Sequence, residues 1–293
     1  MIKIITLLLF LTSCASSRFE RSTAPQNDSF LVETTIRFDG KRLNDWAIEN
    51  GLLGEATKLC QLGDTKDAQE LLKNNLSQFR KDPSYWMVVG NCYWYEKQSA
   101  KAEYFYRLAL GLSKRNKKVT QALHNNLGLL YMERQLYPEA RSELTQADES
   151  LTAKYNLAQI DLLMGNSRGA RGLLADLYRN NRKDPDVLAS LAVAHLLEGN
   201  NKVALQVLSE VPEIEDNRQD IPFYRAMGFY LSGNVEKAEE QLSKVEKADA
   251  SISRLSDMAK RLEQLVQDEI QRREDAAKAA REAAEAKQAT TQG

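Results

Sequence analysis

Apolar positions recur at helical spacing along most of this chain, from about residue 49 to residue 270. The clearest stretch begins at Pro83. Its apolar and small positions are Trp86, Val89, Gly90, Tyr93, Ala102, Tyr106 and Ala109. A polar interval separates Tyr93 from Ala102, so the stretch predicts two amphipathic helices joined by a short turn. Small Gly90 and Ala102 would let the two helices pack closely, with larger apolar side chains around them.

The same pattern returns in phase along the chain. Counted from Trp86, the offsets are 3, 4, 7, 16, 20 and 23. They match the tetratricopeptide pattern W-x2-L-G-x2-Y followed by A-x3-F. Further copies lie near residues 49–82, 121–154, 151–184, 185–218 and 219–252. The sequence therefore resembles the tetratricopeptide repeat family over residues 49–252. This resemblance implies an all-α, right-handed superhelix of about six helix pairs.

Turn chemistry supports the helix boundaries. Four copies place glycine between their two helices, followed by Asp or Asn. These glycines are Gly63, Gly165, Gly199 and Gly233. Glycine is a common helix stop, and Asp or Asn a common start for the next helix. Pro83 and Pro185 are expected at helix starts, where the missing N–H costs nothing.

The last segment, about residues 251–288, predicts one long helix. Its first half keeps apolar spacing from Ile252 to Ile270, so it should cover the apolar end of the repeats. Its second half is rich in alanine and alternating charge. This pattern favours a solvated helical tail, with a docking tail for a partner as the alternative.

The N-terminus is typical of an exported lipoprotein. Lys3 precedes a short apolar run that ends in Leu11-Thr12-Ser13-Cys14, which resembles the bacterial lipobox. This resemblance implies cleavage before Cys14 and lipidation of that cysteine, with palmitate among the acyl chains. Ala15 favours the outer membrane over the inner membrane, because it is not the Asp that resembles a retention signal. The alternative is an ordinary secretory peptide with an accidental cysteine.

Four segments follow from these patterns. Residues 1–13 are predicted to be a signal peptide, and 14–43 the lipidated cysteine with a flexible tether. Residues 44–252 form the repeat solenoid, and 253–293 the capping helix and charged tail.

Composition excludes several classes of function. Lys plus Arg number 40 and Asp plus Glu 41, so the chain lacks the basic excess of a nucleic-acid binder. Two His and three Cys offer little material for a metal site. No HExxH, GxSxG, GxxxxGK[ST] or GxGxxG motif is present. We therefore expect neither catalysis, cofactor, metal nor small-molecule substrate. His124 and His195 are interpreted as packing residues, and the acidic residues as solvated helix faces.

Cys60 and Cys92 fall on the first helices of adjacent copies, where we expect them at different heights. A periplasmic location permits a disulfide, but its geometry is demanding. Two buried free thiols are the favoured prediction, and a disulfide is the alternative.

The concave face of a repeat superhelix is lined by the first helix of each pair. In the family's frame, the concave positions of this chain are unusually apolar. The candidate groove residues, some of them polar, are Met87, Asn91, Trp94, Tyr95, Asn126, Leu129, Met132, Tyr155, Asn156, Gln159, Val193, Phe223, Met227 and Tyr230. Either the protein itself covers them, or they bind an apolar or amphipathic segment of a partner.

Two polar features refine this groove. Some tetratricopeptide repeats bind the C-terminal carboxylate of a peptide with Lys and Arg on the concave face. This chain has Met87 and Thr152 where the resemblance would place those cations, so we do not expect it to bind a carboxylate in that way. Asn126 and Asn156 share one position in adjacent copies. They would hydrogen-bond either an extended peptide backbone or the adjacent helix.

These features predict a non-catalytic protein–protein scaffold, held by its lipid at the periplasmic side of the outer membrane. Its partner would be an envelope protein or peptide segment with apolar surface. The layout resembles the pilotins of type IV pilus systems, which help a secretin ring to assemble. Related repeat lipoproteins act in gliding motility. The alternative is an adaptor for cell-wall enzymes or outer-membrane protein assembly, and an enzyme with an unrecognised site is the least favoured hypothesis.

Overall fold

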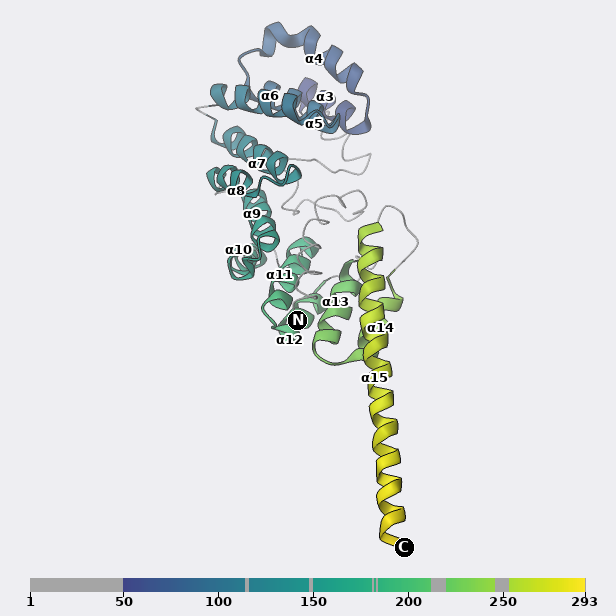
Figure 1. The fold of residues 1–293 in the computed structure, drawn as a ribbon. Helices are drawn as coiled ribbons and strands as arrows, with labels where there is room; N and C mark the ends of the chain where they lie inside the picture. Colours follow the sequence, from purple (N-terminus) through teal and green to yellow (C-terminus); the bar gives the residue numbers. More distant parts are fainter. Residues whose placement is uncertain are drawn as a thin grey trace. The chain divides into compact units, whose positions relative to one another are not determined.

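A computed structural model describes residues 50–113, 116–147, 150–180, 182, 184–211, 220–245 and 253–292. The predicted signal peptide, Cys14 and the tether to residue 43 lie outside these described residues. Within them the chain forms thirteen α-helices and no β-strand (Figure 1). The predicted all-α fold is confirmed.

Two compact units divide the described residues, one ending at Val187 and the other beginning at Leu188. The helices before this boundary are α3 (Gly51–Leu62), α4 (Thr65–Phe79), α5 (Pro83–Tyr95), α6 (Ser99–Leu112), α7 (Lys117–Glu133), α8 (Tyr137–Gln146), α9 (Leu151–Leu163) and α10 (Ser167–Asn180). The boundary falls within α11 (Pro185–Leu197). Beyond it are α12 (Asn201–Ser209), α13 (Asp220–Leu231), α14 (Val235–Ser243) and α15 (Ser253–Gln292).

The first unit is built from helix pairs. Helix α3 packs on α4, α5 on α6, α7 on α8, and α9 on α10. The first helices of successive pairs also contact one another, in the order α3, α5, α7 and α9. This side-by-side stacking of first helices is the arrangement that the repeat pattern predicts.

Close packing inside a pair depends on the small residues identified from the sequence. A Cβ atom added at Gly90 would lie 2.5 Å from a ring carbon of Tyr106. One added at Gly128 would lie 2.5 Å from Leu144 Cγ. Each glycine therefore lets a large side chain of the second helix lie directly against the backbone of the first.

The turns between paired helices have a left-handed residue. Gly63 has φ of 92°, and the other three predicted turn glycines also have positive φ. In the remaining two copies, Lys97 (φ 61°) and Gln135 (φ 59°) take this conformation. Glycine is thus the preferred but not the obligatory residue at this turn.

Helix α5 begins at Pro83 and α11 at Pro185, as predicted. The Asp82 side chain accepts a hydrogen bond from the Ser84 backbone N–H at 2.8 Å, which caps α5. Asp184 accepts from the backbone N–H groups of Asp186 and Val187. Both helices therefore begin with the same Asp-Pro chemistry.

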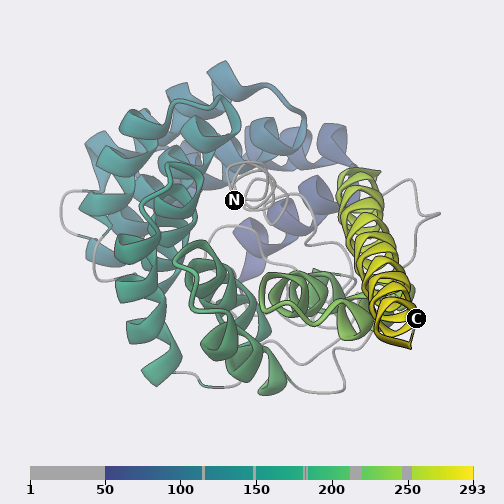
Figure 2. The same ribbon diagram turned by 60° about the horizontal axis from the view of Figure 1, so that its bottom comes forward.

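The long C-terminal helix is confirmed in the second unit. Helix α15 lies against α13 and α14 (Figures 1 and 2). It buries Leu255, Met258, Leu262 and Val266 there. By contrast, residues 271–286 are exposed. No helix of the described chain is both long and apolar enough to cross a membrane.

Candidate functional site

Asparagine side chains connect the first helices of successive pairs. Asn126 on α7 donates to Asn91 Oδ1 on α5 at 3.0 Å, and Asn156 on α9 donates to Asn125 Oδ1 at 2.8 Å. All four asparagines are buried. In the structure, the side-chain nitrogens of Asn126 and Asn156 therefore bond the adjacent helix, which is one of their two expected roles.

A tyrosine side chain also bonds to these buried asparagines. Tyr106 on α6 donates its hydroxyl to Asn91 Oδ1 at 2.8 Å. Burial raises the pKa of Tyr106 well above its ordinary value, so this hydroxyl remains a donor throughout the neutral range. Two buried atoms of α7, Asn125 Nδ2 and Asn126 Oδ1, make no hydrogen bond within the described residues. These two atoms are the unused hydrogen-bonding capacity of the asparagine side chains on α7.

The predicted groove residues differ in accessibility. Five, besides the asparagines, are buried: Tyr155, Gln159, Val193, Phe223 and Met227. Six are half-buried: Met87, Trp94, Tyr95, Leu129, Met132 and Tyr230. The half-buried side chains are the ones that a partner could contact without the protein opening.

Three half-buried residues of the first unit share a buried neighbour. Met87 and Trp94 on α5, and Met132 on α7, all pack against the same hydrophobic core. Trp94 Nε1 donates to Glu133 Oε2 at 2.8 Å, which holds the indole toward α7. We call Met87, Trp94 and Met132 the α5–α7 surface. It brings together predicted groove residues from two successive repeats.

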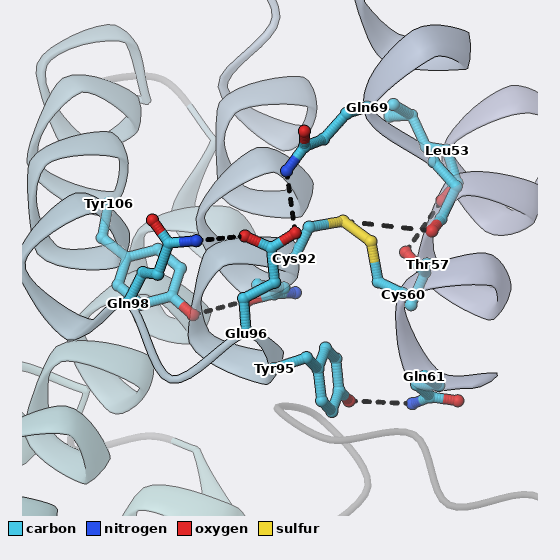
Figure 3. The surroundings of a disulfide bond; sticks show 12 residues. Leu53, Thr57, Cys60, Gln61, Gln69, Cys92, Tyr95, Glu96, Gln98 and Tyr106 are labelled. Carbon is cyan, nitrogen blue, oxygen red and sulfur yellow. Dashed lines mark hydrogen bonds between the residues drawn. A yellow bond between two sulfur atoms is a disulfide. The ribbon is translucent and has the colours of Figure 1, made fainter. Parts of the chain in front are cut away.

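Cys60 and Cys92 form a disulfide, so the favoured prediction of free thiols was wrong (Figure 3). Their Cα atoms lie 5.1 Å apart, within the range that a disulfide requires. The two residues are 32 apart, close to the repeat length, so the neighbouring helices α3 and α5 bring them to nearly the same level. The expectation of different heights was the error.

Polar contacts surround this disulfide. Gln61 Nε2 donates to the Tyr95 hydroxyl at 3.0 Å, and Gln69 Nε2 donates to Glu96 Oε1 at 2.8 Å (Figure 3). Both bonds join the first repeat to α5 or the turn that follows it. Tyr95, a predicted groove residue, therefore takes part in the contact between repeats.

A network of charged groups joins α6 and α7. Glu103 accepts from the Tyr131 hydroxyl at 2.6 Å and from Arg134 at 2.7 Å, and it also pairs with Arg107. Burial raises the pKa of Glu103, but hydrogen bonds from Tyr131, Arg134 and Arg107 outweigh burial and leave that pKa below its usual value. The carboxylate is thus held in its charged form.

The two histidines lie within this helical framework. His124 is half-buried, with Nδ1 2.8 Å from Glu143 Oε2 on α8. His195 is half-buried in α11. Among the described residues, no group of three or more His, Cys, Asp and Glu side chains could hold a metal ion.

One acidic residue departs from the predicted solvated pattern. Asp161 on α9 is buried and pairs with Arg141 on α8. It occupies the repeat position of Tyr93 and Tyr131. The natural Asp at this repeat position supplies an ionic contact between repeats. The pattern of apolar positions could not predict this contact.

Comparison with known proteins identifies the fold. Residues 155–218 match the tetratricopeptide repeat family. No curated protein sequence matches the chain significantly. Solved structures resemble it more broadly, and the fold that they share is the tetratricopeptide repeat solenoid predicted from the sequence.

Three of these structures illustrate the likeness. PilF of Pseudomonas aeruginosa is 19% identical, with a TM-score of 0.58 over 73% of this chain and 98% of PilF. PilW, described as a widely conserved type IV pilus biogenesis factor, is 18% identical, with a TM-score of 0.60 over 71% of this chain and 98% of PilW. YrrB, described as a repeat protein with an unusual peptide-binding site, is 18% identical, with a TM-score of 0.50 over 66% of this chain and 97% of YrrB. At these identities the likeness is one of fold.

Proposed function

We propose that this protein is a non-catalytic scaffold of the bacterial envelope, which binds a partner protein through the first helices of its repeats. The observation that carries the proposal is the α5–α7 surface. It presents two methionines and a tryptophan, which are residue types enriched at protein interfaces. Stacked repeat helices present such residues on a continuous surface suited to a helix or an extended segment.

Two features support an extracytoplasmic location. The sequence Leu11-Thr12-Ser13-Cys14 resembles a lipobox, and Cys60 and Cys92 form a disulfide. Structural disulfides persist in oxidising compartments such as the periplasm. We therefore propose lipidation at Cys14 and anchoring to the outer membrane. Several acyl chains would make this anchoring stable.

The first partner to test is a secretin of a type IV pilus system. The lipobox and repeat number resemble the pilotins, and PilW, one of the similar structures, is described as a pilus biogenesis factor. An assembly role in gliding motility belongs to the same class of function. An adaptor for cell-wall enzymes or for outer-membrane protein assembly would use the same surface.

Site-specific photocrosslinking in native membranes tests the proposal. A photoreactive amino acid replaces Trp94 or Met132 in the full chain, and exposed Lys202 on α12 serves as the control position. We expect one envelope protein to be crosslinked from both test positions and not from Lys202. A secretin would support the pilotin role, and a cell-wall enzyme would support the adaptor role. No adduct at either test position would contradict binding at the α5–α7 surface.

The anchor has a separate test. A Cys14→Ser variant should lose its acyl chains in mass spectrometry and move from the membrane fraction to the soluble periplasmic fraction. A variant that remains in the outer membrane without acylation would overturn the proposed lipid anchor. This experiment does not depend on the identity of the partner.

A further inference from the structure

Helices α5 and α6 carry a column of parallel aromatic rings. Phe105 lies between Trp86 and Tyr93, with ring centroids at 5.6 and 5.3 Å and interplanar angles of 4° in both contacts. Tyr104 contacts the edge of Phe105 at 5.1 Å and is 64% exposed. We call Trp86, Phe105, Tyr93 and Tyr104 the aromatic column. Its three stacked rings are half-buried, so part of the column faces solvent.

Cationic residues flank the column. Lys101 Nζ is 5.0 Å from the Tyr93 ring centroid. Near Trp86, the indole Nε1 donates to the backbone carbonyl of Arg80, so the backbone of Arg80 and of its neighbour Lys81 passes beside the indole. Arg80, Lys81 and Lys101 are exposed, and none forms an ion pair with another described residue.

The acidic residues adjacent to these cations in sequence are already engaged. Asp82 caps α5 through Ser84, and Glu103 is held by Tyr131, Arg107 and Arg134. The exposed charge beside the column is therefore mainly positive. Ring edges also carry partial positive charge, because the aromatic quadrupole is negative only on the ring faces. The column thus favours carboxylates and carbonyl oxygens around an apolar centre.

We propose that the aromatic column binds an extended acidic segment of a partner protein. The stacked rings span roughly three residues of an extended chain, at about 3.3 Å per residue. An apolar or proline residue of the segment lies against the ring edges and Tyr104. Carboxylates on each side pair with Lys101 near Tyr93, and with Arg80 or Lys81 near Trp86.

This site is separate from the α5–α7 surface of the proposed function. Trp86 and Tyr93 are seven residues apart and share one face of α5. Met87 and Trp94 are each displaced from them by about 100° around the helix. A partner could therefore occupy either site alone, and the exposed residues Arg80, Lys101 and Tyr104 can be altered without changing the buried core that both sites share.

A peptide array tests the proposal with the full chain purified in detergent. The peptides are nonamers with three acidic residues at each end and a proline at the centre. The two positions that flank this proline are varied over all apolar residues and proline. A matched set has three lysines at each end. Fluorescence anisotropy then measures the affinity of the best peptide. We expect acidic peptides to bind, basic ones to fail, and affinity to fall as salt is raised.

Charge reversal provides the decisive comparison. The double variant R80E/K101E should weaken the acidic peptide by about tenfold and gain binding of the basic set. Tyr104→Ala should weaken binding of the acidic peptide roughly fivefold. Because the Tyr104 side chain is exposed, this variant should fold normally. Lys202→Glu is the control and should leave the affinity unchanged. Trp94→Ala tests whether the peptide occupies the α5–α7 surface instead.

Three results would overturn the inference. They are failure of every acidic peptide to bind, equal binding of acidic and basic peptides, and insensitivity to the R80E/K101E change. Loss of binding in Trp94→Ala but not in Tyr104→Ala would also overturn it, because the segment would then occupy the α5–α7 surface. That last outcome would leave the proposed function intact.

Discussion

The Tyr106 hydroxyl donates to Asn91 Oδ1 at 2.8 Å, in a buried contact between the two helices of one repeat. The same oxygen accepts from Asn126 Nδ2 at 3.0 Å on the next repeat. One amide oxygen thus joins α5 to its own partner helix and to its neighbour. This arrangement links packing within a repeat to packing between repeats.

Removing the two partners should have unequal effects. Tyr106→Phe should lower the free energy of unfolding by about 1 kcal/mol, because Asn91 retains its bond from Asn126. Asn91→Leu should lower it by about 2–3 kcal/mol, because two buried donors then lack an acceptor. Urea unfolding followed by circular dichroism measures both. A larger loss in Tyr106→Phe would contradict this account.

Gly90→Ala should destabilise the protein by about 1–3 kcal/mol. The added methyl group would lie 2.5 Å from the Tyr106 ring, and the Ala102 carbonyl at 3.3 Å limits any shift. Gly111→Ala is the matched control, because its Cβ meets nothing within 4 Å in α6. It should stabilise by roughly 0.5–1 kcal/mol. Thermal melts of the two variants should therefore move in opposite directions.

Replacing both cysteines with serine should destabilise the first two repeats. By loop entropy alone, closing a loop of 32 residues contributes about 3–4 kcal/mol. Wild type should lose a comparable amount on treatment with a reductant, whereas the double variant should not respond. Limited proteolysis should then cut within α3 or α4 first. Equal melting temperatures with and without reductant would show that the disulfide contributes nothing.

Lys97→Gly should stabilise the turn between α5 and α6. Lys97 has φ of 61°, which costs a side-chain-bearing residue about 1 kcal/mol and costs glycine little. Gln135→Gly should behave alike, because its φ is 59°. Urea midpoints should rise for each variant and add in the double variant. A fall in either midpoint would show that the lost side chain matters more than the backbone.

Glu103→Gln should change how stability depends on pH. The pKa of Glu103 in the folded protein lies below its usual value of 4.5, so its charged form stabilises the fold above that pH. This contribution is lost as pH falls through the lowered pKa. Wild type should therefore be more stable than Glu103→Gln at pH 7, with the difference vanishing once the pH is below the lowered pKa. Exposed Glu139→Gln is the control, and a difference that persists at the acid end of the titration would exclude the ionic explanation.

The repeated pattern was sufficient to predict the helix pairs. Positions such as Gly90 and Ala102 have a fixed spacing because close helix packing requires small residues there. Helix starts at Pro83 and Pro185 were equally predictable, since local backbone chemistry sets them. The boundary between the two compact units within α11 was not predictable, because the apolar residues of that helix continue across Val187 and Leu188 without a break.

The candidate site was predictable only by position. The repeat frame placed Met87, Trp94 and Met132 on first helices, and the structure brings them to one core. It could not decide whether Asn126 bonds a peptide or Asn91, because both roles need the same side chain. The Cys60–Cys92 separation of 32 residues, close to the repeat length, was a signal in the sequence that the expectation of different heights overlooked. The Asp161–Arg141 pair depends on how two helices face each other, which the pattern of apolar positions does not contain.

Each sulfur-bearing residue of the Cys60–Cys92 pair is only 2% exposed. With α3 and α5 packed, the two sulfur atoms are therefore shielded from solvent. An oxidant or a reductant reaches them only when these two helices separate. The redox state of the Cys60–Cys92 pair is thus coupled to the opening of the first two helix pairs, so its rate of reduction reports how often they open.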